Sequence, residues 1–324
     1  MTLTVPLDQP GQHYGHIRLP WSRDASAWGH VMVPVCVLNA GPGPTALVTG
    51  GNHGDEYEGP LAIRRLLADP PPLTGTIIAI PSLNHPAFVA GTRTSPIDGG
   101  NLNRAFPGDA AGTVTRKIAA FVNDHLIPLA DLVVDFHSGG KTLDFLPMAV
   151  SHILDDAEQD ARSAAAARAF GAPYTARLRE IDDSGMLDGA AERAGKTFVT
   201  TELGGGGTTT PARVQIACDG LARLLAHQGL LATAPPPGST RALDLSDPAG
   251  FHFAPGPGLF EPLAHLGDTV TPGMPLARVY PIEDIAAPPV PIIAAVAGLV
   301  AARHVPGLVQ PGDCAFVIGS VDTA

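Results

Sequence analysis

Short apolar runs of strand length alternate with helical segments through the middle of the chain. The runs are rich in β-branched and apolar residues, and they lie at 45–50, 76–83, 131–137 and 196–203. Segments of helical composition separate or follow them at 60–69, 112–130, 155–170 and 211–229. Strands that alternate with helices need crossover connections, so the pattern predicts an α/β domain over 45–231 with a mixed, largely parallel sheet flanked by helices.

Two further regions flank this predicted domain. Residues 1–44 alternate apolar runs with turns, which predicts an N-terminal β extension packed on the main domain. A proline-rich linker at 232–239 precedes a region, 240–324, in which short strands are separated by Gly-Asp, Pro-Gly and Pro turns. This region is predicted to be a smaller all-β domain of barrel-sandwich type. Because residues 232–324 contain no lysine, a carrier function of the biotinyl or lipoyl kind is disfavoured.

Charge and composition exclude several classes of protein. The formal net charge of −11 argues against nucleic-acid binding and against docking on an anionic membrane. No apolar run approaches the roughly 18 residues of a membrane span, and no signal peptide is evident. The three cysteines are far apart, so we expect a reduced, cytoplasmic protein. The sequence leaves open whether it forms a homo-oligomer. The motifs of P-loop, dinucleotide-binding and serine hydrolase sites are absent.

Polar residues gather where the predicted strands end. The segments are GGNHGDEYEG (50–59), GTRTSPIDGGNLNRAFPG (91–108), DFHSGG (135–140) and TTELGGGG (200–207). In open α/β sheets the carboxyl ends of the strands form the edge at which ligands bind. We therefore expect these four segments to build one site.

Two histidines and a glutamate form a candidate metal site. His53 and Glu56 are spaced H-x-x-E directly after a strand, and His137 ends another strand. Imidazole and carboxylate are the ligands that zinc takes, with three protein ligands and an open position in catalytic sites. H-x-x-E alone is a weak signal, and His137 could instead be a hydrogen-bonded core histidine. Asp135 could orient the imidazole of His137 or serve as a loop cap.

A third strand end supplies a candidate base. Glu202 follows mostly apolar and hydroxyl residues, where a carboxylate is costly to bury unless it is paired or functional. Beside a metal it would act as a general base, although a salt-bridged strand end is the alternative. Arg104 with Asn103 would bind a substrate carboxylate, and Arg93 would stabilise an oxyanion. Each arginine taken alone is as compatible with a solvated loop.

These residues together resemble a known family. The order H-x-x-E, Arg, Asn-Arg, His, Glu is similar to that of the succinylglutamate desuccinylase/aspartoacylase family, which has a zinc carboxypeptidase-like fold. The resemblance implies one zinc ion per subunit, bound by His53, Glu56 and His137. It implies that Arg93 polarises the carbonyl, that Asn103 and Arg104 hold the α-carboxylate, and that Glu202 is the base. A small N-acyl amino acid is the implied substrate.

A closer likeness concerns the substrate. The stretches LVTGGNHGDEYEGP, GTRTSPIDGGNLNRAFPG, DFHSGGKTLDF and TTELGGGGT resemble the branch of the family that deacetylates N-α-acetyl-L-2,4-diaminobutyrate in ectoine breakdown. Acidic loop residues would suit the side-chain ammonium of such a substrate; they are Asp55, Glu58, Asp98, Asp144, Asp182 and Asp183. The alternatives are a deacylase of acidic N-acyl amino acids, a metallocarboxypeptidase acting on peptides, and a binding protein without catalysis.

Overall fold

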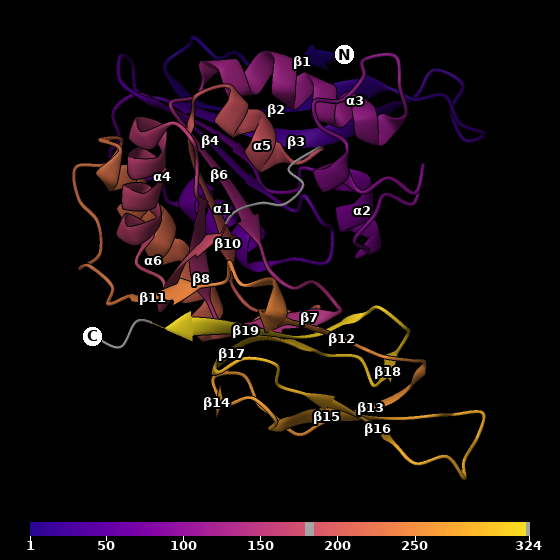
Figure 1. Cartoon of the computed structure of the whole chain (residues 1–324). Helices are drawn as coiled ribbons and strands as arrows, with labels where there is room; N and C mark the ends of the chain where they lie inside the picture. The colour runs from indigo at the N-terminus through magenta and orange to yellow at the C-terminus, as the bar shows by residue number, and fades with distance from the viewer. Residues whose placement is uncertain (179–184, 322–324) are drawn as a thin grey trace.

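The computed structural model describes residues 1–178 and 185–321, and a long mixed sheet runs through it (Figure 1). The strands of the first 244 residues are β1 (Thr2–Leu3), β2 (Gly11–Pro20), β3 (His30–Asn39), β4 (Thr45–Gly50), β5 (Thr76–Ile80), β6 (Leu132–His137), β7 (Leu143–Phe145), β8 (Met148–His152), β9 (Tyr174–Leu178), β10 (Thr197–Glu202) and β11 (Arg241–Asp244). The helices are α1 (Glu58–Ala68), α2 (His85–Ala90), α3 (Val114–Phe121), α4 (Ala157–Phe170), α5 (Leu187–Arg193) and α6 (Pro211–His227).

The centre of the sheet is parallel, as the alternating pattern predicts. Strands β5, β4, β6 and β10 lie side by side and run in the same direction. Alternate side chains point to opposite faces of these strands. Leu47 and Val133 join a core that includes residues of α3 and α5, whereas Val48 and Val134 join a second core with α1, α4 and α6. The sheet is thus buried on both faces, between two helical layers (Figure 1).

Antiparallel strands extend this parallel centre on both sides. The predicted N-terminal extension forms β2 and β3, and β3 pairs with β5. On the other side β8 runs antiparallel to β10 and is followed by β9 and β11. Strands β7, β8 and β9 and the short helices α2 and α5 were not expected from the sequence.

The helix predicted over 112–130 is wrong in its length. Only α3 is α-helical; a π-helical turn at Val122–Leu126 and a 3-10 turn at Ile127–Leu129 follow it. Pro128 lacks a backbone N–H and therefore cannot continue the hydrogen-bond ladder of an α-helix. The apolar stripe that suggested a single helix is nevertheless buried throughout.

The C-terminal region is built from short antiparallel strands. They are β12 (Phe251–Phe253), β13 (Gly258–Pro262), β14 (Thr269–Val270), β15 (Pro275–Tyr280), β16 (Val290–Ile293), β17 (Gly298–His304), β18 (Leu308–Val309) and β19 (Cys314–Val321). A four-stranded layer, β16-β15-β13-β18, packs against β12, β14, β17 and β19 over a core that includes Phe260, Leu276 and Phe316. The predicted all-β character of this region is therefore confirmed, and its strands are antiparallel.

This C-terminal region continues the main sheet. Strand β19 pairs with β11, and β17 pairs with β7, where Ala302 lies opposite Phe145. The backbone N–H of Leu146 also donates to the carbonyl oxygen of Ala301 at 2.9 Å. Across the part of the chain that the structure describes, no helix is both long and apolar enough to cross a membrane.

Candidate active site

The ends of three parallel strands bring the predicted segments together. Strand β6 lies between β4 and β10, and in its pairing with β10 His137 is opposite Glu202. Helix α1 approaches β6 closely because Gly59 has no side chain; a Cβ there would lie 2.0 Å from Cβ of Phe136. The loop between β4 and α1, which carries His53 and Glu56, is thereby held beside the end of β6.

All seven residues predicted for the site line a single cavity of about 380 Å³. They come from the loop after β4, the 91–108 segment, and the ends of β6 and β10. The other lining residues are Ser138, Gly139, Thr142, Leu143, Phe145, Val150, His152, Leu178, Met186, Asp188 and Thr200. The four predicted segments therefore line one cavity, as expected. The role of each residue stays a prediction.

His53, Glu56 and His137 converge on one another. Their candidate ligand atoms all lie within 4.8 Å of each other. Nδ1 of His53 is 2.8 Å from Oε1 of Glu56, and Nδ1 of His137 is 2.9 Å from Oε2 of the same carboxylate. His53 and Glu56 are almost fully buried.

The outer nitrogens of both rings face oxygen acceptors. Nε2 of His53 lies 3.1 Å from Oδ1 of Asn101, and Nε2 of His137 lies 2.8 Å from Oδ2 of Asp135. An amide or carboxylate oxygen there favours the tautomer with hydrogen on Nε2, which leaves the Nδ1 lone pair directed at Glu56. Two lone pairs and a carboxylate that face one another need a shared proton or a cation. This donor set of two imidazoles and one carboxylate fits zinc.

Charge and burial perturb this cluster in opposite directions. Burial alone would raise the pKa of the Glu56 carboxyl, but the two imidazoles outweigh it and hold that pKa well below its usual range. Burial also favours neutral His137, yet the Asp135 and Glu56 carboxylates raise its pKa well above the ordinary value. For His53, burial prevails and lowers the pKa. The ionised form of Glu56 and the protonated form of His137 are thus favoured together.

The carboxylate of Asp135 lies against the ring of His137, the position that an orienting role requires. Besides the imidazole, its carboxylate accepts hydrogen bonds from Thr49 Oγ1 at 2.7 Å and from Asn52 Nδ2 at 2.8 Å. Asp135 is buried on the strand that ends in His137. A carboxylate that fixes the ring of a metal-ligating histidine is a common outer partner in metal sites.

Glu202 contributes a carboxylate with unused hydrogen-bonding capacity. Its Oε2 is buried, and among the described residues no group forms a hydrogen bond to it. Burial, together with the nearby negative charge of Glu56, raises the pKa of Glu202 to about 8; His137 and Arg93 act against this shift. A perturbed carboxyl group in a cavity is a candidate for proton transfer. Among the described residues Glu202 forms no ion pair, so the alternative of a salt-bridged strand end is not supported.

Three cationic or amide side chains border the same cavity. Nη1 of Arg93 donates to Oε1 of Glu56 at 3.5 Å, and about half of the Arg93 side chain is exposed. Asn103 is buried and its Oδ1 accepts from the backbone N–H of Leu187 at 3.0 Å. Nη1 of Arg104 donates to the carbonyl oxygen of Asn103 at 2.6 Å. The guanidinium groups and the Asn103 amide nitrogen are available donors for an anionic substrate group.

The four acidic loop residues that the structure describes do not line the cavity. Asp55 accepts from the backbone N–H of Lys141, Glu58 from Ser138 Oγ, and Asp98 from Thr115. Asp144 forms an ion pair with Arg213 at 2.7 Å.

Asp182 and Asp183 lie outside the described residues.

Three residues of the site were not predicted from the sequence. Asp188 and His152 line the cavity, and Asn101 contacts the ring of His53.

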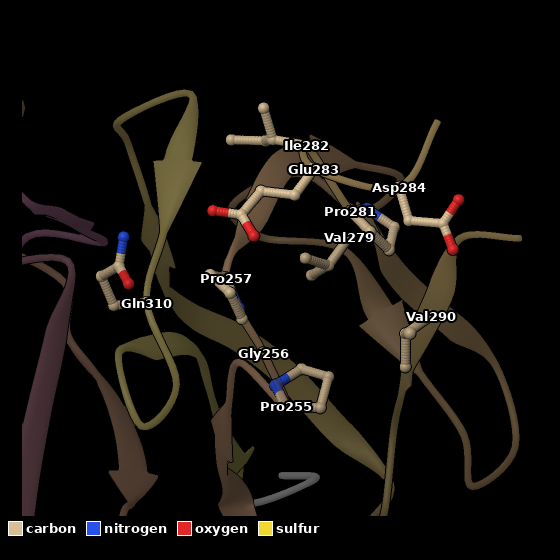
Figure 2. A pocket seen from close by; sticks show the side chains of 10 residues that line it. All are labelled: Pro255, Gly256, Pro257, Val279, Pro281, Ile282, Glu283, Asp284, Val290 and Gln310. Atoms are coloured by element: carbon tan, nitrogen blue, oxygen red, sulfur yellow. The ribbon is translucent and has the colours of Figure 1, made fainter. Parts of the chain in front are cut away.

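A larger hollow lies in the C-terminal region. Its volume is about 660 Å³, and Figure 2 shows that prolines and aliphatic side chains form much of its wall. Its two carboxylates, on Glu283 and Asp284, point in different directions (Figure 2). Its described lining contains no histidine, cysteine or arginine. The concentration of reactive groups thus identifies the smaller cavity as the candidate active site.

An imidazole–carboxylate donor set beside a buried carboxyl group, at the carboxyl edge of an α/β sheet, is the arrangement found in hydrolases that use a metal ion. The comparisons with known proteins show that the chain is similar to hydrolases. A model of the succinylglutamate desuccinylase/aspartoacylase catalytic domain matches residues 42–228. The chain belongs to this family of hydrolases, which act on N-acyl amino acids.

Relatives that match nearly the full chain are known. The N-alpha-acetyl-L-2,4-diaminobutyric acid deacetylase of Halomonas elongata is 47% identical over 99% of this chain and 95% of its own length. A product-bound structure of the ectoine utilization protein EutE (DoeB) from Ruegeria pomeroyi has a TM-score of 0.96 and 52% identity over 98% of both chains. A succinylglutamate desuccinylase structure from Silicibacter sp. TM1040 has a TM-score of 0.96 and 50% identity, over 99% of this chain and 98% of the other.

Proposed function

We propose that this protein is a zinc-dependent deacetylase of N-α-acetyl-L-2,4-diaminobutyrate, releasing acetate and the free diamino acid during ectoine degradation. The observation that carries the proposal is the near-full-length similarity to relatives named for this substrate and for ectoine utilization. The His–Glu–His cluster and the buried carboxyl of Glu202 supply chemistry that amide hydrolysis needs. The three cysteines are free, which supports a cytoplasmic location.

His53, Glu56 and His137 would hold the zinc ion, one in each chain. When bound, zinc would supply Lewis acidity that polarises the amide carbonyl and makes a water molecule more acidic. A cation beside Glu202 would also offset the negative charge of Glu56, which together with burial raises the Glu202 pKa. The base would then be ionised near neutral pH.

The side chains of the cavity would carry out the remaining tasks. Asn103 and Arg104 would hold the α-carboxylate of the substrate, with Arg104 offering its guanidinium as a planar donor. Glu202 would take a proton from the attacking water as the new C–O bond forms. Arg93 would stabilise the oxyanion of the tetrahedral intermediate. Glu202 would return the proton to the nitrogen as the C–N bond breaks, giving acetate and the amine.

The second candidate is a deacylase of acidic N-acyl amino acids. The observation in its favour is the structure from Silicibacter sp. TM1040, which is described as a succinylglutamate desuccinylase and is 50% identical to this chain. A dicarboxylic substrate would need a second cation for its side-chain carboxylate. Among the described residues that line the cavity, the arginines are Arg93 and Arg104, both already required by the proposed chemistry.

A direct comparison of substrates tests the proposal. The zinc-loaded protein is incubated with N-α-acetyl-L-2,4-diaminobutyrate, N-acetyl-L-aspartate, N-succinyl-L-glutamate and a peptide with a free carboxyl end, and product release is measured. We expect kcat/KM to be highest for the acetylated diamino acid. A preference for either dicarboxylate supports the second candidate, and cleavage of the peptide alone supports a carboxypeptidase.

A further inference from the structure

A third carboxylate lines the active-site cavity, on the wall formed by α5. Asp188 lies in the first turn of this helix and is buried. Of the other two acids in the described lining, Glu56 is held between two imidazoles, and Glu202 ends the strand beside them. Asp188 is therefore the cavity acid that belongs to a different wall from the His–Glu–His cluster.

The first turn of α5 is fixed against the segment that carries Asn103 and Arg104. The backbone N–H of Leu187 donates to Oδ1 of Asn103 at 3.0 Å. The backbone N–H of Phe106 donates to the carbonyl oxygen of Gly185 at 2.9 Å. Asp188, which follows Leu187, therefore lines the same cavity as Asn103 and Arg104 on a wall that is fixed against them.

The surroundings of Asp188 suit a short methylene chain that ends in a charge. Val150, Leu178 and Met186 line the same cavity and present apolar surface. His152, on β8, has its Nε2 4.0 Å from Oδ2 of Asp188. Asp188 thus contributes a carboxylate to the cavity beside apolar surface.

Two further contacts keep this wall in position. Nδ1 of His152 lies 2.9 Å from Oε1 of Glu192, one helical turn beyond Asp188. The backbone N–H of Gly189 donates to Oδ1 of Asp188 at 2.6 Å. The carboxylate is thus held by its own helix and by a strand of the sheet, which is the preorganisation that a binding group needs.

We propose that Asp188 determines specificity by receiving the side-chain ammonium of the substrate, and so selects N-acyl diamino acids. The inference rests on the proposed function and names the residue that makes the active site favour a cationic side chain. The same carboxylate would repel the side-chain carboxylate of N-acetylaspartate or N-succinylglutamate, because like charges at close range in a buried site are unfavourable.

Two substrates that differ in side-chain charge but little in shape distinguish ammonium binding by Asp188 from a purely structural role of this residue. N-α-acetyl-L-norvaline has a methyl group where N-α-acetyl-L-2,4-diaminobutyrate has its ammonium, so the two differ in charge and little in shape. We expect the wild-type protein to prefer the ammonium substrate. In Asp188→Asn, kcat/KM for that substrate should fall by about 30-fold or more, the size of effect expected when one partner of a buried charge pair is removed. The rate on the norvaline substrate should stay within about threefold of wild type, since it lacks the charge.

Asp144→Asn is the matched control. Asp144 lies between the cavity residues Leu143 and Phe145 but does not line the cavity, and its carboxylate pairs with Arg213. This variant removes one negative charge near the site and should keep the preference for the ammonium substrate.

Two outcomes would contradict the assignment of Asp188, and a third would contradict the proposed function. If Asp188→Asn retains the wild-type preference, the ammonium is bound elsewhere and the assignment is wrong. If its rates on both substrates fall together, Asp188 is structural and the assignment is again wrong. If the wild-type protein shows no preference for the ammonium substrate, the proposed function itself is wrong.

Discussion

We predict that the carboxylate of Asp135 stabilises the metal site by fixing the orientation of the His137 ring. It accepts hydrogen bonds from Thr49 and Asn52 and faces Nε2 of His137. In Asp135→Ala the Thr49 hydroxyl still reaches the carbonyl oxygen of Val134 at 3.1 Å. The Asn52 amide and the His137 ring would each lose a buried acceptor, at about 1–3 kcal/mol apiece, so the free energy of unfolding should fall by about 2–6 kcal/mol.

The same change should weaken zinc binding. Loss of the partner that orients a ligating imidazole costs about 10–100-fold in metal affinity. Asp135→Asn should lose less, because its amide oxygen can still accept from Asn52 and His137 while its NH₂ group faces Thr49. Zinc affinity is measured by competition with a chromophoric chelator, and stability by denaturant unfolding of the metal-free protein.

Asp131→Ala is the control for this experiment. Asp131 precedes the same strand at its opposite end, where Oδ2 accepts from the backbone N–H of Thr45 at 2.8 Å. Its loss should leave zinc affinity unchanged. Wild-type zinc affinity in Asp135→Ala would refute the orienting role, and an equal loss in both variants would show that the effect is one of general stability.

Three other predictions concern the site and its support. Burial raises the pKa of Glu202 to about 8, above its ordinary 4.5, so in the metal-free protein its contribution to stability is complete below pH 4.5 and is lost as pH rises through 8. Glu202→Gln should therefore become progressively more stable than wild type between pH 5 and pH 8 in urea titrations, and a constant difference would contradict this origin of the shift. Gly59→Ala should lower the free energy of unfolding by about 1–3 kcal/mol because its methyl group would collide with Phe136, and an unchanged melting temperature would exclude that collision. Arg104→Ala should raise KM by about 10–100-fold with a smaller effect on kcat, since it removes a charged hydrogen bond to the substrate carboxylate; steady-state kinetics distinguishes this from a loss in kcat alone.

Much of the active-site edge could be predicted because it depends on local patterns. The apolar runs at 45–50 and 131–137 are typical of buried parallel strands, and both form such strands. A polar residue at the C-terminal end of such a strand lies at the carboxyl edge of the sheet. His137 and Glu202 therefore lie side by side although they are far apart in the chain.

The opposite wall of the cavity depends on contacts that no local pattern reveals. Strand β7 has only three residues, and it pairs with β17 far along the chain. Helix α5 is short and contains Gly189, a poor helix former, so its apolar residues give no clear period. Asp188 enters the cavity because α5 packs beside the segment that carries Asn103. The sequence makes acidic loops such as that of Asp55 equally suitable, but this carboxylate accepts from the backbone N–H of Lys141 and does not line the cavity.

The most direct test of the central claim measures turnover and bound metal in one preparation of Glu202→Gln. The account predicts that this variant binds about one zinc ion per chain, because His53, Glu56 and His137 are unchanged. It also predicts that acetate release from N-α-acetyl-L-2,4-diaminobutyrate falls by at least about 100-fold, since the group that moves the proton is gone. Near-normal acetate release with zinc bound would contradict the assignment of Glu202 as the base.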